Sequence, residues 1–316
     1  MVFVLPRQTF TLNMNSEMNT QKTRIAVLGS HGRLGGALLR KWSERYLVTG
    51  FARPQFDLLS SESIDQCLES GDYDWVINCA ANTNVDGCEK DPSSAFAANE
   101  HAPRHIARRC HERRHRLIHI STDYVFDGKK SEPYSENDVV SPISIYGESK
   151  AGGDEAVMTE APDSIIVRVS WVFGPEKPSF IDAILKKART DPSASAVADK
   201  WSNPTYADDV ADWLAALIDQ NAPAGFYHLC NSGGCTWRDY GEHALRCAEA
   251  AGISLQTTTV SPISMKDIPA FVAQRPVHTV MSTSKFSQTT GVTPRDWQDA
   301  VESYITSITA GELTTN

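Results

Sequence analysis

The sequence RIAVLGSHGRLG, residues 24–35, decides the fold of this chain of 316 residues. Ile25–Leu28 is an uninterrupted apolar run, typical of a strand covered on both faces. The turn after it has GxxGxxG spacing, and apolar residues between 34 and 42 recur at helical spacing. Glycine permits a tight turn and lets backbone N–H groups approach a pyrophosphate at the helix N-terminus. The segment therefore predicts a dinucleotide site made by Gly29, Gly32, Arg33, Leu34 and Gly35.

Strands and amphipathic helices alternate beyond this segment as far as Phe173. Further apolar strands are expected at residues 47–52, 75–80, 117–121 and 165–169. This alternation predicts an α/β fold with a doubly wound parallel sheet, the Rossmann arrangement. After Phe173 the pattern loosens, which indicates a smaller, partly interleaved C-terminal substrate domain.

The expected domain boundaries follow from these patterns. Residues 22–173 and 206–230 are assigned to the dinucleotide-binding domain, and residues 174–205 and 231–316 to the substrate domain. Residues 1–21 are expected to be a disordered extension. Asp91-Pro92 predicts a helix start, Pro103 a kink or restart, and Thr205 the cap of a helix over 206–219.

Charge and composition exclude several classes of function. A net charge of -9 argues against binding of nucleic acid or an anionic membrane. No apolar run approaches the roughly 18 residues of a membrane helix. The seven cysteines are scattered without CxxC spacing, which favours reduced thiols in a cytoplasmic protein. No metal site is expected. The basic run 104–116 is interpreted as the solvent-exposed face of a helix.

The second strand bears on the choice of cofactor. An acid at its end would bind the ribose 2′-hydroxyl of NAD, but Gly50–Arg53 contains none. Arg53 fits a 2′-phosphate instead, which favours NADP(H), with NAD(H) as a possible second cofactor; a solvated loop arginine is the alternative. Asp57 lies beyond Pro54 and is interpreted as part of the adenine pocket.

Tyr146 and Lys150 form a Tyr-x-x-x-Lys pair on one face of an expected helix. A free tyrosine has a pKa near 10, and a neighbouring ammonium favours the phenolate and lowers that value. Thr122 ends the preceding strand, where its hydroxyl would hold a substrate oxygen beside the phenol. The pair alone also occurs on ordinary helix surfaces; the three residues in this order predict a catalytic set.

Six stretches resemble the dTDP-4-dehydrorhamnose reductases, a family of extended short-chain dehydrogenases. They are VINCAANTNVD (76–86), STDYVFDG (121–128), SPISIYGESK (141–150), RVSWVFG (168–174), GFYHL (225–229) and QRP (274–276). The resemblance covers residues 24–305. It implies NADPH-dependent reduction of the 4-keto group of a nucleotide-activated 6-deoxyhexulose, for cell-surface polysaccharide synthesis. The expected partner is the nucleotide sugar, and the expected assembly is a monomer or homodimer.

The resemblance also implies roles for individual residues. It makes Thr122, Tyr146 and Lys150 catalytic and gives Asn99 a supporting role. The residues that it places at the cofactor are Asp57, Leu58, Ala81, Asn82 and Thr83, together with Tyr146 and Lys150. It places Thr122, Asp123 and Trp171 at the sugar and Arg275 at the nucleotide diphosphate. Ala37 departs from the family, because some members carry there a glutamate that holds magnesium at a dimer interface.

Other interpretations stay open at this stage. The regulatory beta subunit of methionine adenosyltransferase shares related stretches and would make the chain a binding partner. A reductase of a UDP- or GDP-linked keto-sugar would keep the chemistry and change the nucleotide. Trp171 favours a sugar enzyme, since an aromatic face suits sugar stacking, although packing between the domains would also explain it.

Overall fold

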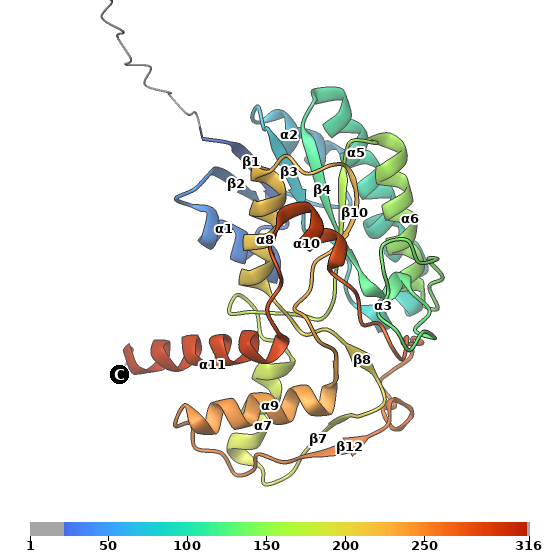
Figure 1. Cartoon of the computed structure of the whole chain (residues 1–316). Coiled ribbons are helices and arrows are strands. Elements are labelled where there is room, and N and C mark those ends of the chain that lie inside the picture. The colour runs from blue at the N-terminus through green and yellow to red at the C-terminus, as the bar shows by residue number, and fades with distance from the viewer. Residues whose placement is uncertain (1–21, 315–316) are drawn as a thin grey trace, which may run out of the picture.

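A six-stranded parallel sheet forms the centre of the molecule, which we describe over residues 22–314 of a computed structural model (Figure 1). The expected extension 1–21 lies outside the described residues. In sheet order the strands are β10 (Gly225–His228), β5 (Ile165–Val169), β4 (Arg116–Thr122), β3 (Trp75–Asn78), β1 (Arg24–Leu28) and β2 (Leu47–Phe51). The predicted doubly wound sheet is confirmed, and its order reverses between β1 and β3.

Helices cover both faces of this sheet. One face carries α1 (Arg33–Trp42) and α8 (Ala207–Asp219), and the other carries α2 (Ser61–Glu69), α5 (Ala102–Arg113) and α6 (Ile145–Glu160) (Figure 1). The two faces follow from the two-residue period of a strand. Ile25 and Val27 pack against α1 and α8, while Ala26 and Leu28 pack against α2 and α5. We call the sheet with its helices the sheet lobe.

The connection between β3 and α5 is built from short helical segments. They are α3 (Val85–Lys90), α4 (Pro92–Phe96) and a π-helical turn, η1 (Ala97–His101). Asp91 caps α4 by accepting the Ser94 N–H, as its position before Pro92 predicts. The expected restart at Pro103 is also confirmed, because α5 begins at Ala102 and places this proline in its first turn.

A second apolar cluster forms the small lobe. It contains α7 (Phe180–Thr190), α9 (Trp237–Ala250), α11 (Trp297–Thr314) and a two-stranded sheet of β7 (Ala194–Val197) and β12 (Val260–Ile263). The remaining elements are β6 (Val172–Phe173), β8 (Trp201–Ser202), β9 (Thr205–Tyr206), β11 (Cys235–Thr236), α10 (Ser284–Thr290) and two 3-10 turns, η2 (Asp123–Val125) and η3 (Met265–Asp267). Phe286 of α10 packs into the core of the sheet lobe. The boundaries expected at 173, 205 and 230 stay a prediction.

One predicted cap is wrong. The helix over 207–219 begins after Tyr206, and the Thr205 side chain makes no bond to its first turn. The Thr205 hydroxyl instead donates to the carbonyl of Asn203, 3.0 Å away. Thr205 lies in β9, which pairs with β6, so its backbone belongs to a strand and its hydroxyl is already bonded to Asn203.

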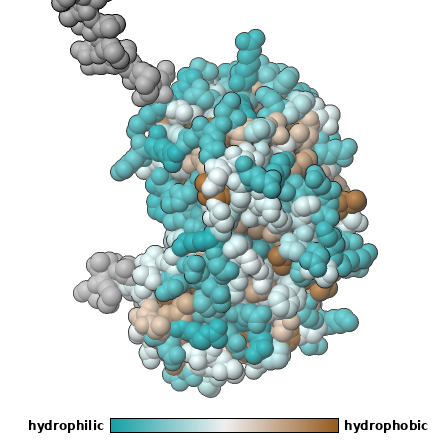
Figure 2. Space-filling model, in the orientation of Figure 1, coloured by the Kyte–Doolittle hydropathy of each residue, from teal (hydrophilic) through white to brown (hydrophobic). Residues whose placement is uncertain are grey.

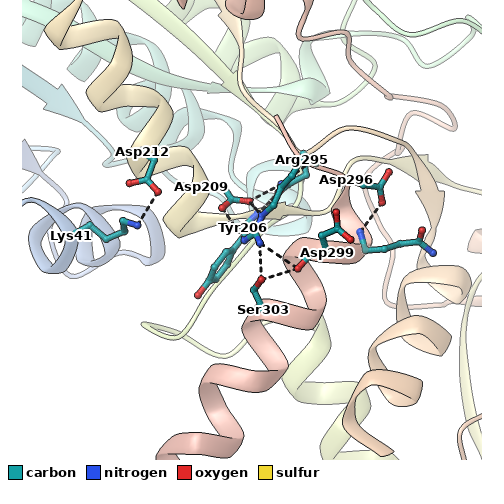
Figure 3. Close-up of polar contacts among 10 residues, drawn as sticks. Lys41, Tyr206, Asp209, Asp212, Arg295, Asp296, Asp299 and Ser303 are labelled. Atoms are coloured by element: carbon teal, nitrogen blue, oxygen red, sulfur yellow. Dashed lines mark hydrogen bonds and ion pairs between the residues drawn. The ribbon is translucent and has the colours of Figure 1, made fainter. Parts of the chain in front are cut away.

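Arg295 joins the two lobes. Its Nε and Nη2 donate to the two carboxylate oxygens of Asp209 on α8, at 2.8 and 2.9 Å, and Nη1 donates to Ser303 of α11 at 2.6 Å (Figure 3). A two-point arginine–carboxylate contact fixes geometry as well as distance. Arg295 therefore holds α11 in a defined position relative to α8.

The surface is mostly hydrophilic on the face that Figure 2 shows, with small, separated hydrophobic patches. Among the described residues, no helix combines the length and the apolar character that crossing a membrane requires.

Candidate active site

The glycine turn lies where the strand order reverses, at the carboxyl ends of β1 and β3. Gly29 has a φ of +83°, and a Cβ there would lie 2.9 Å from the backbone nitrogen of Ala80. A Cβ on Gly35 would lie 2.3 Å from the carbonyl oxygen of Gly29. Glycine is therefore required at both positions. Gly32 caps α1 without a side-chain acceptor, which leaves the first N–H groups of that helix to a ligand.

A cavity of about 800 Å³ lies along this edge of the sheet. Its walls include Gly29, Gly32, Arg53, Asp57, Leu58, Ala81, Asn82 and Thr83, all predicted to bind the cofactor. His31 and Lys177, which sequence reasoning missed, also line it. Arg53 and Lys177 bring two cationic side chains to a cavity that is large enough for a dinucleotide.

The other predicted residues of the turn, Arg33, Leu34 and Gly35, do not line this cavity but support the residues that do. Leu34 is buried in the core, and Gly35 packs on the backbone of Gly29. The Arg33 guanidinium donates to the carbonyls of Lys177 and Pro178, at 3.4 and 2.7 Å. Arg33 therefore positions the loop that carries Lys177 against α1.

A second cavity, of about 150 Å³, adjoins the first at Thr83. It is lined by Thr83, Val85, Thr122, Asp123, Tyr124, Tyr146, Trp171, Lys200, Ser202 and Trp237. The predicted catalytic hydroxyls and the predicted sugar contacts thus share one small cavity. Lys200, Ser202 and Trp237 were not predicted, because neither spacing nor local pattern distinguishes them in the sequence.

Hydroxyl groups surround the Asp123 carboxylate. Thr122 donates to Oδ1 at 3.2 Å, while Ser170 and Thr279 donate to Oδ2 at 3.0 and 2.5 Å. The carboxylate is almost fully buried, so these bonds replace its water. Asp123 fixes the Thr122 hydroxyl at the edge of the cavity, next to Tyr146, whose hydroxyl also bonds the Thr122 side chain.

Tyr146 and Lys150 lie on one face of α6, as predicted. The pKa of Tyr146, however, is shifted in the direction opposite to the expected one. Burial raises the pKa of Tyr146 well above its usual range, and the bond with Thr122 only partly opposes it. The predicted lowering by the Lys150 ammonium is therefore wrong for this state of the site. Lys150 turns towards β4, where Nζ donates to the Ile120 carbonyl at 2.7 Å and lies 3.2 Å from His119 Nε2.

Lys150 lies in a fully buried polar cluster. Burial lowers its pKa to about 8, against the opposing effect of Asp154 one helical turn further along. Asp154 in turn pairs with Arg168 of β5, with 3.3 Å between Oδ2 and Nε. Burial, with a smaller effect of Lys150, lowers the pKa of His119 well below its usual range, so the imidazole is neutral at neutral pH.

Asn99 supports the loop between the two cavities. Its Oδ1 accepts the Asn82 N–H at 2.9 Å, and its Nδ2 donates to the Asn82 carbonyl at 3.0 Å. The same Nδ2 donates to Ser149 of α6 at 3.1 Å. Asn99 thus connects the loop after β3 to the helix that carries Tyr146, which fits the expected supporting role.

Arg275 is placed outside both cavities. Its Nη1 and Nη2 donate to the two oxygens of Asp86 on α3, at 3.1 and 2.5 Å, and Asp86 also accepts the N–H groups of Val272 and Ala273. This contact lowers the pKa of Asp86 to about 2. The Arg275 guanidinium is thus already bonded to a carboxylate of the protein. Its expected role at the nucleotide diphosphate stays a prediction.

Trp171 lies in the wall of the smaller cavity and in an aromatic cluster. Its ring centroid is 5.1 Å from that of Trp237 and 4.9 Å from that of Tyr240. Its φ of +48° is unusual for a bulky residue. The position of Trp171 is thus compatible both with a packing role and with contact to a substrate. Over residues 22–314, no group of three His, Cys, Asp or Glu side chains is arranged to hold a metal ion.

Comparison with known proteins gives a consistent result. Residues 23–310 match a family model described as the RmlD substrate binding domain. The chain is 31% identical over 286 residues to the dTDP-4-dehydrorhamnose reductase of Aggregatibacter actinomycetemcomitans, covering 88% of this chain and 97% of that one. It is 32% identical over 316 residues to the enzyme of the same name from Mycolicibacterium smegmatis, covering 98% and 94%.

A solved structure agrees with these relatives. The dTDP-4-dehydrorhamnose reductase of Bacillus anthracis, solved in complex with NADP, superposes with a TM-score of 0.84 at 28% identity, covering 90% of this chain and 99% of that one. The resemblance read from the six sequence stretches is thereby confirmed. The chain belongs to the RmlD substrate binding domain family, as a relative of the dTDP-4-dehydrorhamnose reductases.

Proposed function

We propose that the protein is an NADPH-dependent reductase that converts dTDP-4-dehydrorhamnose to dTDP-rhamnose, for the synthesis of cell-surface polysaccharide. The observation that carries the proposal is that the two cavities share Thr83 in their walls. In this proposal a dinucleotide in the larger cavity lies beside a sugar held at Thr122 and Tyr146. In this proposal the enzyme acts in the cytoplasm as a monomer or homodimer.

The larger cavity fits NADP(H) on two grounds. The Gly29 and Gly35 positions leave room where any Cβ would collide with backbone, and the uncapped start of α1 offers N–H groups to a pyrophosphate. Arg53 and Lys177 supply positive charge for phosphate groups. When bound, the cofactor supplies the hydride. NAD(H) remains a second, poorer cofactor in this proposal, because no acid follows β2 to bind a ribose 2′-hydroxyl.

Each residue of the smaller cavity has a different role towards the substrate in this proposal. Tyr146 gives its hydroxyl proton to the oxygen of the reduced carbonyl, and Thr122, fixed by Asp123, orients that oxygen. Lys150 stays largely protonated at neutral pH, because its lowered pKa is still about 8. In this proposal Lys150 also helps to hold the cofactor, as the resemblance implies. Trp171 covers one side of the sugar.

A regulatory subunit without catalysis is the weaker alternative. Such a protein has no need to keep the Thr122 and Tyr146 hydroxyls together in the wall of a small cavity. A reductase of a UDP- or GDP-linked keto-sugar uses the same residues, so the nucleotide is decided by experiment.

The test is oxidation of added NADPH by the purified protein, followed at 340 nm, with dTDP-, UDP- and GDP-linked 4-keto-6-deoxyhexuloses. We expect the dTDP-linked sugar to give the highest kcat/KM, with dTDP-rhamnose as the product. Turnover of none of the three sugars, together with tight binding of another protein, would instead support the regulatory alternative.

A further inference from the structure

Lys200 is a buried lysine that the proposed mechanism does not use. Its side chain is 2% exposed, yet it lines the smaller cavity together with Thr122 and Tyr146. It stands in the connection between β7 and β8, and its surroundings come from distant parts of the chain. Burying an ammonium costs several kcal/mol unless its charge and its N–H groups find partners.

The protein supplies only part of what this ammonium requires. Nζ donates to the Pro276 carbonyl at 2.8 Å and to Ser202 Oγ at 3.2 Å. A lysine has three N–H donors, so these bonds leave one unused among the described residues. The Tyr124 ring centroid, 5.1 Å away, gives a weak cation–π contact.

Asp123 influences Lys200 without pairing with it directly. Between them Ser202 Oγ lies 2.8 Å from Thr279 Oγ1, which donates to Asp123 at 2.5 Å. The carboxylate is already bonded by the hydroxyls of Thr122, Ser170 and Thr279. The loss of water around the buried ammonium lowers the pKa of Lys200 to about 8, because this effect is larger than the opposing attraction of the Asp123 carboxylate. The ammonium thus keeps one donor for something inside the cavity.

The cavity limits what that partner is. About 150 Å³ is too small for a nucleotide, so only the sugar end of a nucleotide sugar fits here. An anionic sugar substituent would meet the Asp123 carboxylate in the same wall, which disfavours it. A neutral hydroxyl both accepts from an ammonium and tolerates a nearby carboxylate.

We propose that Lys200 is a substrate-binding residue that donates to a ring hydroxyl of the sugar and selects hydroxylated over deoxygenated sugars. The inference rests on the proposed function, because it takes the ligand to be a nucleotide sugar. The competing explanation is that Lys200 only holds the Pro276 carbonyl against β8.

The test compares calorimetric binding of dTDP-rhamnose and of dTDP to the NADP-loaded protein. For Lys200→Met we expect about 10- to 100-fold weaker binding of dTDP-rhamnose, the usual effect of a lost charged hydrogen bond, and unchanged binding of dTDP. Lys200→Gln, which retains a donor, should recover part of the loss. Lys285→Met is the matched control, because Lys285 also donates to a carbonyl beside a tyrosine ring, outside both cavities.

If Lys200→Met loses dTDP and dTDP-rhamnose binding equally, or loses neither, the proposal is overturned and Lys200 has a purely structural role. If Lys200→Met does not fold, wild-type protein decides instead. At least one monodeoxy analogue of dTDP-rhamnose should bind about 10-fold more weakly than the parent sugar, and equal binding of all analogues overturns the proposal. If wild type binds a UDP- or GDP-sugar instead, the proposed function fails and the same comparison is made with that sugar.

Discussion

Tyr146 concentrates the proposed chemistry in one hydroxyl. Its ring is buried between Thr122 and the aromatic ring of Tyr124, whose centroid is 5.5 Å away. Tyr146→Phe keeps that packing and removes the proton donor. We expect kcat to fall about 100- to 10,000-fold, the range for loss of a general acid, with NADPH affinity changed less than a few-fold. Stopped-flow turnover and NADPH fluorescence titration measure the two effects. Full activity in the purified variant would remove Tyr146 from the mechanism.

Arg53 is the residue on which the cofactor preference depends. It is exposed at the wall of the larger cavity, after a strand that ends without an acid. We expect a modest preference for NADPH over NADH in the wild type. Arg53→Ala should reduce that preference about 2- to 5-fold through kcat/KM for NADPH alone, as loss of one exposed phosphate contact implies. Arg108→Ala, on the outer face of α5, serves as the control. Equal use of both cofactors by the wild type would contradict the prediction.

Trp171 shows how a short connection between elements places a side chain. It lies between β5 and β6 with a left-handed backbone, which turns the ring towards Trp237 and the cavity. We expect Trp171→Ala to fold, to bind NADPH normally and to lose most of its catalytic efficiency with the keto-sugar. Steady-state kinetics beside thermal denaturation separates this outcome from a packing role.

Trp213 provides the comparison for that variant. It is buried in the core of the sheet lobe, away from both cavities. Trp213→Ala should lose about 3–5 kcal/mol of stability with unchanged kinetics of the folded fraction. If Trp171→Ala behaves in the same way, its ring belongs to the core and not to the sugar site.

Local sequence patterns predicted those elements whose causes are local. The glycine turn, the five strands up to Val169 and the Tyr146–Lys150 pair all follow from neighbours within one helix or turn. Thr205 was misassigned because the strand pairing of β9 with β6, a contact distant in sequence, overrides its capping preference. Lys200 was missed for a similar reason, since its partner Pro276 lies 76 positions away. The direction of the Tyr146 pKa depends on burial, which no spacing reveals.

Buried neutral histidines are one source of pH-dependent stability in the whole molecule. Burial and the nearby Arg168 lower the pKa of His228 to about 3, and that of His119 lies well below its usual range. In the unfolded chain both would titrate near 6.5. Between pH 4 and 6.5 the unfolded state therefore binds more protons than the folded state, and stability falls as the pH falls. Each such group contributes a slope of up to about 1.4 kcal/mol per pH unit, whereas the buried Asp154 carboxyl, whose pKa burial raises, acts in the opposite direction.

Urea denaturation at several pH values measures this slope. In His228→Gln the slope should fall by up to about 1.4 kcal/mol per pH unit, whatever the change in absolute stability, because one titrating group is removed. The carboxylates whose pKa values are lowered, such as Asp86, lose their contribution only below about pH 4, outside the window. A wild-type stability that does not change between pH 4 and 6.5 would contradict the assignment of neutral histidines.

The interleaving of the lobes has a consequence for the growing polypeptide. β5 ends at Val169, but its sheet neighbour β10 begins only at Gly225, 56 positions later, and Phe286 covers the core later still. At ribosomal rates of roughly 5–20 residues per second, β5 waits about 3–11 s for its partner. During that interval the nascent chain presents an open strand edge, the kind of surface on which chains associate wrongly. We therefore expect the yield of native protein to depend on how well that edge is shielded until β10 has been synthesised.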